Sequence, residues 1–175
     1  VRLKLPQSSV FSLPNPVGSE QAILYKCWHK TDMKFPFDGT YTITQKFGEN
    51  PDYYRQFGIN GHDGLDWGCP DGTTVLAAES GRVMQPPAPR DFGNFVAVWH
   101  PALHCMSWYC HLRSSSVTPG SVVSKGQVIG VSDNTGNSRG THLHFALSQT
   151  DNDGQIINKG NGYGGCINPL PFFDH

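Results

Sequence analysis

Two short segments of the sequence combine imidazole and carboxylate groups at spacings that suit a metal ion. In the first, residues 61–67 (GHDGLDW), a histidine and an aspartate stand four residues apart. The glycines disfavour a helix, and on an extended segment His62 and Asp66 point to the same face. Gly64 leaves the space between them open. Both side chains could therefore reach one small object.

The second segment, residues 141–145 (THLHF), alternates imidazole with apolar side chains. On a strand His142 and His144 would share one face, with Leu143 and Phe145 on the other. Two histidines and one aspartate match the ligand set of a catalytic zinc that keeps a fourth position for water. Such a site retains a charge of about +1, which lowers the pKa of bound water to about 7 and polarises a carbonyl. The sequence therefore predicts a zinc site suited to hydrolysis.

A third segment, residues 108–112 (WYCHL), offers one more imidazole. The same alternation predicts that Tyr109 and His111 share a face. A spare imidazole on the ligand strand could deprotonate water, and one from another strand could stabilise a developing oxyanion. For the remaining histidines we predict structural roles, because proline, tryptophan or tail residues surround them; they are His29, His100, His104 and His175.

Two other catalytic patterns are disfavoured by the sequence. Residues 136–140 match G-x-S-x-G, but that motif needs a strand, a sharp turn and a helix, and a β-like segment follows here. The H-E-x-x-H helix signature does not occur, which excludes a thermolysin-like site.

The segments between these motifs are typical of β-structure. Glycine (20 residues) and proline (13 residues) are abundant and separate short runs of β-forming residues. We predict a hairpin over residues 95–112 and an up-and-down meander over residues 117–132. The remaining expected strands are 41–44, 75–84 and 142–148. The fold class that follows is all-β, a compact antiparallel sandwich or barrel-like domain.

The two ends of the chain are less regular. Residues 1–39 contain several prolines and a serine-rich stretch, with one short helical possibility near residues 20–28. We expect this segment to be an N-terminal arm or edge, with the main domain at residues 40–175. A Gly/Asn-rich tail begins at about residue 149.

Charge and composition exclude several classes of protein. The 13 basic and 14 acidic residues give a net charge of −1, which argues against a nucleic-acid-binding surface. No apolar run reaches the ~18 residues that span a bilayer, so we expect no membrane-embedded segment. The chain starts at Val1 without a signal peptide, as expected where a leader has been removed or the sequence starts further along. Five cysteines without a C-x-x-C pair exclude Cys-rich zinc modules and permit at most two internal disulfides, which weakly favours an oxidising compartment.

Over about residues 40–148 the chain resembles the lysostaphin/LytM-type zinc metallopeptidases, the glycyl-glycine endopeptidase family with a duplicated hybrid motif fold. These enzymes cut peptide bonds in bacterial peptidoglycan. Residues 168–171 (NPLP) look like the family's closing turn. The matching segments follow the family's order and are residues 43–48, 62–66, 72–83, 93–96, 109–112, 125–130, 134–136 and 142–145.

The resemblance implies a role for each residue of the constellation. Carried over position by position, one Zn²⁺ would be bound by His62, Asp66 and His144. His142 would act as base towards the metal-bound water and His111 as stabiliser of the transition state. Tyr53, or else Tyr54, would line the substrate groove.

The departures from the family pattern are Arg139, Thr141 and Ala146, and they affect the expected substrate preference rather than the chemistry. The leading hypothesis is a zinc endopeptidase that acts on peptidoglycan stem peptides or cross-bridges, outside the cell or in the envelope of a bacterium, or as part of a phage. A non-catalytic or latent peptidoglycan-binding regulator is the alternative, in which residues 1–39 could supply a fourth ligand. A metal-free phosphocarrier is disfavoured, because the carboxylate of Asp66 would repel a phosphoryl group. The cleaved bond and the oligomeric state stay open.

Overall fold

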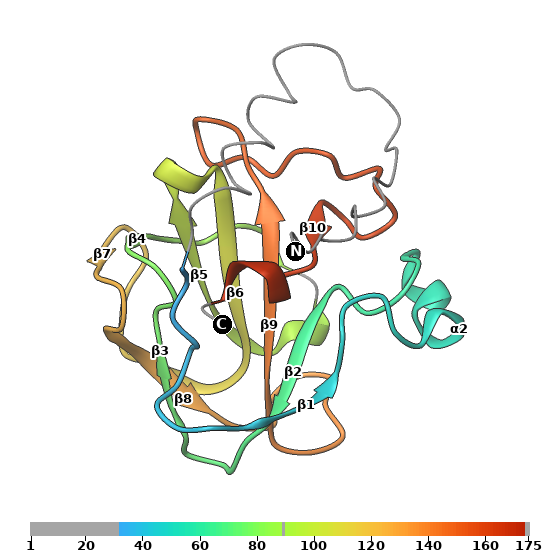
Figure 1. The fold of residues 1–175 in the computed structure, drawn as a ribbon, viewed down its shortest axis with the longest axis horizontal. Helices are drawn as coiled ribbons and strands as arrows, with labels where there is room; N and C mark the ends of the chain where they lie inside the picture. Colours follow the sequence, from blue (N-terminus) through green and yellow to red (C-terminus); the bar gives the residue numbers. More distant parts are fainter. Residues whose placement is uncertain (1–31, 89, 174–175) are drawn as a thin grey trace, which may run out of the picture.

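The computed structural model describes residues 32–88 and 90–173. Ten β-strands dominate this part of the chain, and their pairings are antiparallel (Figure 1). The strands are β1 (Thr42–Gln45), β2 (Gly64–Gly68), β3 (Thr74–Leu76), β4 (Gly81–Met84), β5 (Asn94–His100), β6 (Cys105–Ser115), β7 (Val122–Val123), β8 (Val128–Ser132), β9 (His142–Gln149) and β10 (Cys166–Ile167). The helical elements are short: α2 (Pro51–Tyr54) and the 3-10 turns η1 (Arg55–Phe57), η2 (Arg90–Phe92), η3 (Pro101–Leu103) and η4 (Leu170–Phe172).

The strands form one sheet whose main path is β1-β2-β9-β6-β5-β4-β7. β8 pairs with β6 and β3, and β10 pairs with the end of β9. In Figure 1, β9 and β6 stand at the centre, with β2 and β1 to one side and β5 and β4 to the other. The predicted compact antiparallel all-β domain is confirmed. The sheet does not close into a barrel, since its path ends at β1 and at β7.

The predicted strand over residues 75–84 is wrong, because this segment forms two strands, β3 and β4, that pair with different partners. β5 and β6 form the expected hairpin, closed by the pair His100 and Cys105. The predicted meander over residues 117–132 is wrong, because β7 pairs with β4 while β8 pairs with β3 and β6. Gly126, at a left-handed φ of +79°, donates its N–H to the Ala77 carbonyl at 2.7 Å, and this turn places the chain beside β3 rather than back along β7.

Period-2 alternation divides the sheet into two faces. One face holds the larger core, where Leu143 and Phe145 pack with Trp67. The opposite face holds a smaller apolar cluster that includes Trp108 and Ala146. His142 and His144 alternate with Leu143 and Phe145 along β9, so they point to the face of the smaller cluster.

Residues 32–39 lie against the main core. Met33 is fully buried and forms a β-bridge with Phe173, and its N–H donates to the Phe172 carbonyl at 2.7 Å. Most of the predicted arm, including the helical possibility near residues 20–28, lies outside the described residues. Within residues 32–88 and 90–173, no helix has the length and apolar character needed to cross a bilayer.

Candidate metal centre

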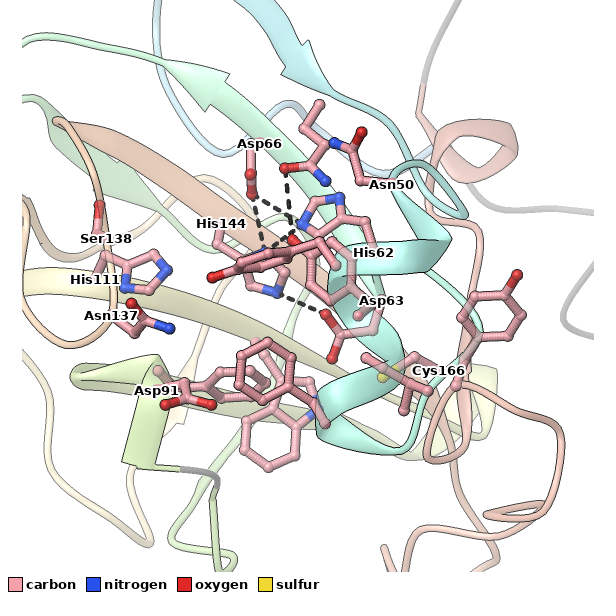
Figure 2. A pocket seen from close by; sticks show the side chains of 18 of the residues that line it. Asn50, His62, Asp63, Asp66, Asp91, His111, Asn137, Ser138, His144 and Cys166 are labelled. Atoms are coloured by element: carbon pink, nitrogen blue, oxygen red, sulfur yellow. Dashed lines mark hydrogen bonds and ion pairs between the residues drawn. The ribbon is translucent and has the colours of Figure 1, made fainter.

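Strands β2 and β9 bring three potential ligands to one buried point. Asp66 on β2 pairs directly with His144 on β9, and His62 lies just before β2. His144 Nδ1 lies 2.9 Å from Asp66 Oδ1 and 3.0 Å from His62 Nε2, and His62 Nε2 lies 3.2 Å from Asp66 Oδ1. The three residues are 1–8% exposed. Figure 2 shows the side chains converging from the two strands.

The hydrogen-bond partners of the rings leave lone pairs for a metal ion. His62 Nδ1 lies 3.2 Å from the Lys46 carbonyl, which can only accept, so this nitrogen carries the proton and Nε2 is bare. His144 Nδ1 points between His62 Nε2 and Asp66 Oδ1. The three atoms lie within 4.8 Å of one another. Their spacing is close to the separation of about 3.3 Å expected for tetrahedral ligands of zinc, so the two imidazoles and one carboxylate fit such an ion.

Glycines make room for this arrangement at two positions. A Cβ on Gly61 would lie 2.4 Å from the Gly48 carbonyl oxygen, so the chain before His62 packs directly on that turn. A Cβ on Gly64 would lie 2.4 Å from the Phe145 carbonyl oxygen and 2.8 Å from Cε1 of His144. The glycine at position 64 therefore allows the His144 ring to rest against the backbone of β2.

The electrostatics favour an ionised carboxylate at this point. Burial by itself would raise the pKa of Asp66, but the neighbouring rings of His144 and His62 outweigh it and hold the pKa well below its usual range. Burial would lower the pKa of His144, yet the neighbouring carboxylates of Asp66 and Asp63 leave that pKa raised. The carboxylate of Asp66 is therefore ionised at neutral pH.

Two further imidazoles lie beside the three ligands, each held by a backbone carbonyl. His142 Nδ1 donates to the Gly140 carbonyl at 2.8 Å, and His111 Nδ1 donates to the Thr135 carbonyl at 2.7 Å. In both rings this leaves Nε2 to face the site. The ring centroids of His111 and His142 are 4.7 Å apart, and His142 Nε2 lies 3.8 Å from Asp66 Oδ1.

His111 reaches the site through an irregularity in β6. The expectation that Tyr109 and His111 share a face is wrong, because the β5–β6 register shifts between the pairs at Tyr109 and Leu112, which inserts one extra residue in β6. His111 takes a left-handed φ of +61° within this bulge. Tyr109 consequently points into the main core and accepts the Ala78 N–H at 2.7 Å, whereas His111 faces the smaller cluster. Burial and the charge of His144 lower the pKa of His111 to about 4, so its ring is neutral.

A groove opens beside the five residues. Tyr54 stands next to His62, with ring centroids 5.5 Å apart, while the more exposed Tyr53 lies under the guanidinium of Arg139, 5.5 Å from its ring centroid. The resemblance implied Tyr53, or else Tyr54, as a groove residue, and both side chains line the groove. Its aromatic lining residues are Tyr53, Tyr54, Phe57, Phe92, Trp108 and Tyr163.

The structure brings together every residue that the sequence singled out for chemistry, and it adds Asp63. From the sequence alone, Asp63 had no predicted role. The other described histidines have separate surroundings: both ring nitrogens of His100 are hydrogen-bonded, to the Ser80 carbonyl and the Ser107 hydroxyl. The cysteines Cys69, Cys110 and Cys166 are buried free thiols.

Comparisons with known proteins agree with this geometry. Residues 60–159 match the profile of peptidase family M23, a span that contains all five site residues. The chain is 33% identical over 114 residues to the peptidoglycan DD-endopeptidase ShyA of Vibrio cholerae and 35% identical over 127 residues to lysostaphin of Staphylococcus staphylolyticus. Each alignment covers 65% of this chain and 26% of the relative, so the chain spans about a quarter of their length.

Solved structures give the same result for the fold. The catalytic domain of lysostaphin from Staphylococcus simulans superposes with a TM-score of 0.61 at 28% sequence identity, over 75% of this chain and 91% of that domain. LytU superposes with a TM-score of 0.60 at 27% identity, over 78% of this chain and 86% of LytU.

Proposed function

This chain belongs to peptidase family M23, and we propose that it is a zinc-dependent endopeptidase that hydrolyses peptide bonds in peptidoglycan stem peptides or cross-bridges. The observation that carries the proposal is the convergence of three ligand atoms within 4.8 Å, with two imidazoles beside them whose Nε2 atoms face the same space. A purely structural histidine cluster would not need two rings left open at Nε2.

The proposed roles follow from the hydrogen-bond partners of each ring. His62, Asp66 and His144 would hold one Zn²⁺ through Nε2, a carboxylate oxygen and Nδ1. When bound, Zn²⁺ supplies a Lewis acid that lowers the pKa of water and polarises a carbonyl. The ligand atoms of these three residues face one another rather than the groove. Proton transfer would therefore be carried out by other side chains.

His142 and His111 are the proposed catalytic imidazoles. His142 holds one proton on the Gly140 carbonyl, so its Nε2 can take a proton from the attacking water and return it to the leaving amine. His111 is the proposed stabiliser of the charge that develops on the scissile carbonyl oxygen.

The side chains that line the groove favour a peptide as substrate. Exposed aromatic rings give apolar contact area, and Arg139, fixed over Tyr53, offers a positive charge to a carboxylate of the peptide. ShyA is named a peptidoglycan DD-endopeptidase, and that name, together with the match to lysostaphin, supports peptidoglycan peptides over other peptides. Such a substrate implies action outside the cell or in the cell envelope.

Digestion of purified cell walls tests the proposal. We expect new amino termini to appear with zinc present, to disappear after chelation and to return when zinc is restored. The absence of new termini, or cleavage indifferent to the chelator, would contradict the proposal. Mass spectrometry of the released peptides then identifies the cleaved bond.

The latent regulator differs from the enzyme by a fourth protein ligand. Among the described residues the cluster comprises three ligating residues, which supports a position left for water. A ligand from residues 1–31 would lie outside the described part of the chain. Trimming these residues distinguishes the two functions: an active enzyme keeps its rate, whereas a latent protein gains cleavage.

A further inference from the structure

Asp63 lies next to the candidate metal centre but is not one of the three ligating residues. It follows His62 directly and precedes β2. Its Oδ1 lies 3.6 Å from Nε2 of His144, at the edge of the ring opposite the one that faces Asp66 (Figure 2). The side chain is 17% exposed, so this carboxylate is largely withdrawn from water beside a buried ring.

His144 needs an acceptor at Nε2 if Nδ1 binds a metal. An imidazole that ligates through Nδ1 keeps its single proton on Nε2. In the described part of the chain Nε2 of His144 is buried without a hydrogen-bond partner. The Asp63 oxygen at 3.6 Å is just beyond the usual range of an N–H···O bond, and a shift of about half an ångström would complete one.

The apolar neighbours of the ring do not decide which way round it lies. Gly64 and the Phe92 ring, whose centroid is 5.5 Å from that of His144, restrict the imidazole to a narrow slot. A ring turned by 180° would fill the same slot but would exchange each nitrogen for a carbon. A carboxylate distinguishes the two states, because it attracts an N–H and gains little from a C–H.

We propose that Asp63 is a positioning residue that accepts the Nε2–H of His144 and so directs Nδ1 to the metal. The inference rests on the proposed function, since it presupposes a metal ion on His144. A carboxylate behind a ligating histidine fixes the tautomer and orientation of the ring, and loss of such a partner typically weakens metal binding 10–100-fold.

Zinc affinity, measured on the full chain by competition with a chromophoric chelator, tests the inference. We expect Asp63→Ala to bind zinc 10–100-fold more weakly than the wild type. Asp63→Asn, which keeps an acceptor oxygen, should recover part of the loss. Asp153→Ala removes one exposed carboxylate elsewhere and should bind zinc as the wild type does. The visible spectrum of the cobalt-substituted protein should change in Asp63→Ala, because a reoriented ligand alters the ligand field.

Besides the melting result given last, three results would overturn the role of Asp63. These are wild-type zinc affinity in Asp63→Ala, equal losses in Asp63→Ala and Asp63→Asn, and a change in KM for cell-wall peptides with zinc affinity unchanged. A melting temperature that falls equally with and without zinc, at unchanged affinity, indicates a structural residue and also overturns it.

The same series separates this inference from the proposed function. A wild-type protein that binds no zinc overturns both. A wild-type protein that binds zinc and cleaves no cell wall overturns the endopeptidase, and the affinities of the Asp63 variants still decide the role of that residue.

Discussion

Nε2 of His62 and Nδ1 of His144 lie 3.0 Å apart, although 82 residues separate the two histidines along the chain. The pairing of β2 with β9 produces this contact, because it sets Asp66 directly opposite His144. The candidate metal centre therefore depends on one strand pair, and substitutions can separate the proposed ligation and catalysis from strand packing.

Ligand and catalytic histidines should respond differently to alanine. We expect His144→Ala to lose both bound zinc and cleavage, because it removes one of three ligands. His142→Ala should retain about one zinc per chain and lose cleavage 10²–10⁴-fold, the usual contribution of a general base. Metal analysis and cell-wall digestion of the two purified variants make the comparison. Cleavage by His144→Ala would show that the ligand assignment is incorrect.

Zinc should stabilise the folded protein measurably. A ligand present at 100 times its Kd and bound only to the folded state adds about 2.7 kcal/mol. For a chain of this length that corresponds to a rise in Tm of about 5–10 °C. Thermal melts of chelated and zinc-loaded protein measure the difference. His144→Ala is the control, and an equal rise in that variant would place the zinc elsewhere.

Gly64→Ala should damage both stability and metal binding. Its Cβ would meet the Phe145 carbonyl oxygen at 2.4 Å and Cε1 of His144 at 2.8 Å, so β2 and β9 must move apart. We expect a loss of about 1–3 kcal/mol in the free energy of unfolding, together with weaker zinc binding. Gly160→Ala, whose Cβ would meet no atom within 4 Å, is the matched control. Equal stability of the two variants in urea unfolding would contradict the packing described for position 64.

His100 should make the protein less stable below neutral pH. Burial lowers the pKa of His100 from its ordinary value of 6.5, against the opposing effects of the Ser80 carbonyl and Glu79. Above pH 6.5 the ring is neutral in both states. As the pH falls below 6.5 the unfolded chain takes up a proton that the folded chain does not, so stability falls by up to about 1.4 kcal/mol per pH unit.

The variant His100→Gln isolates this contribution. It loses the titrating ring, so the difference in free energy of unfolding between wild type and variant should narrow between pH 7.5 and 5.0. Urea unfolding at several pH values measures the difference. A gap that stays constant across this range would show that His100 is not held neutral by burial.

Local patterns in the sequence were sufficient to predict features that depend on a single strand. Alternation along residues 142–145 put two imidazoles on one face and Leu143 and Phe145 in the core, as the structure has them. The spacing of His62 and Asp66 also predicted that they meet, although His62 itself lies just before β2. Such predictions succeed because the direction of successive side chains on a strand depends only on the backbone of that strand.

The directions of the Asp63 and His111 side chains could not be predicted from local alternation. Asp63 precedes β2, so strand alternation does not govern its direction. His111 sits in a bulge, where one extra residue in β6 reverses the face expected from Tyr109.

The sequence by itself determined the β-class and the residues of the candidate site, because the hydrophobic period and the types of side chain are local features of the chain. Tertiary structure alone decided that β7 joins β4, that a bulge aims His111, and that Asp63 stands behind His144. Strand register and bulges minimise the free energy of contacts between segments distant in the chain, and no local period encodes those contacts.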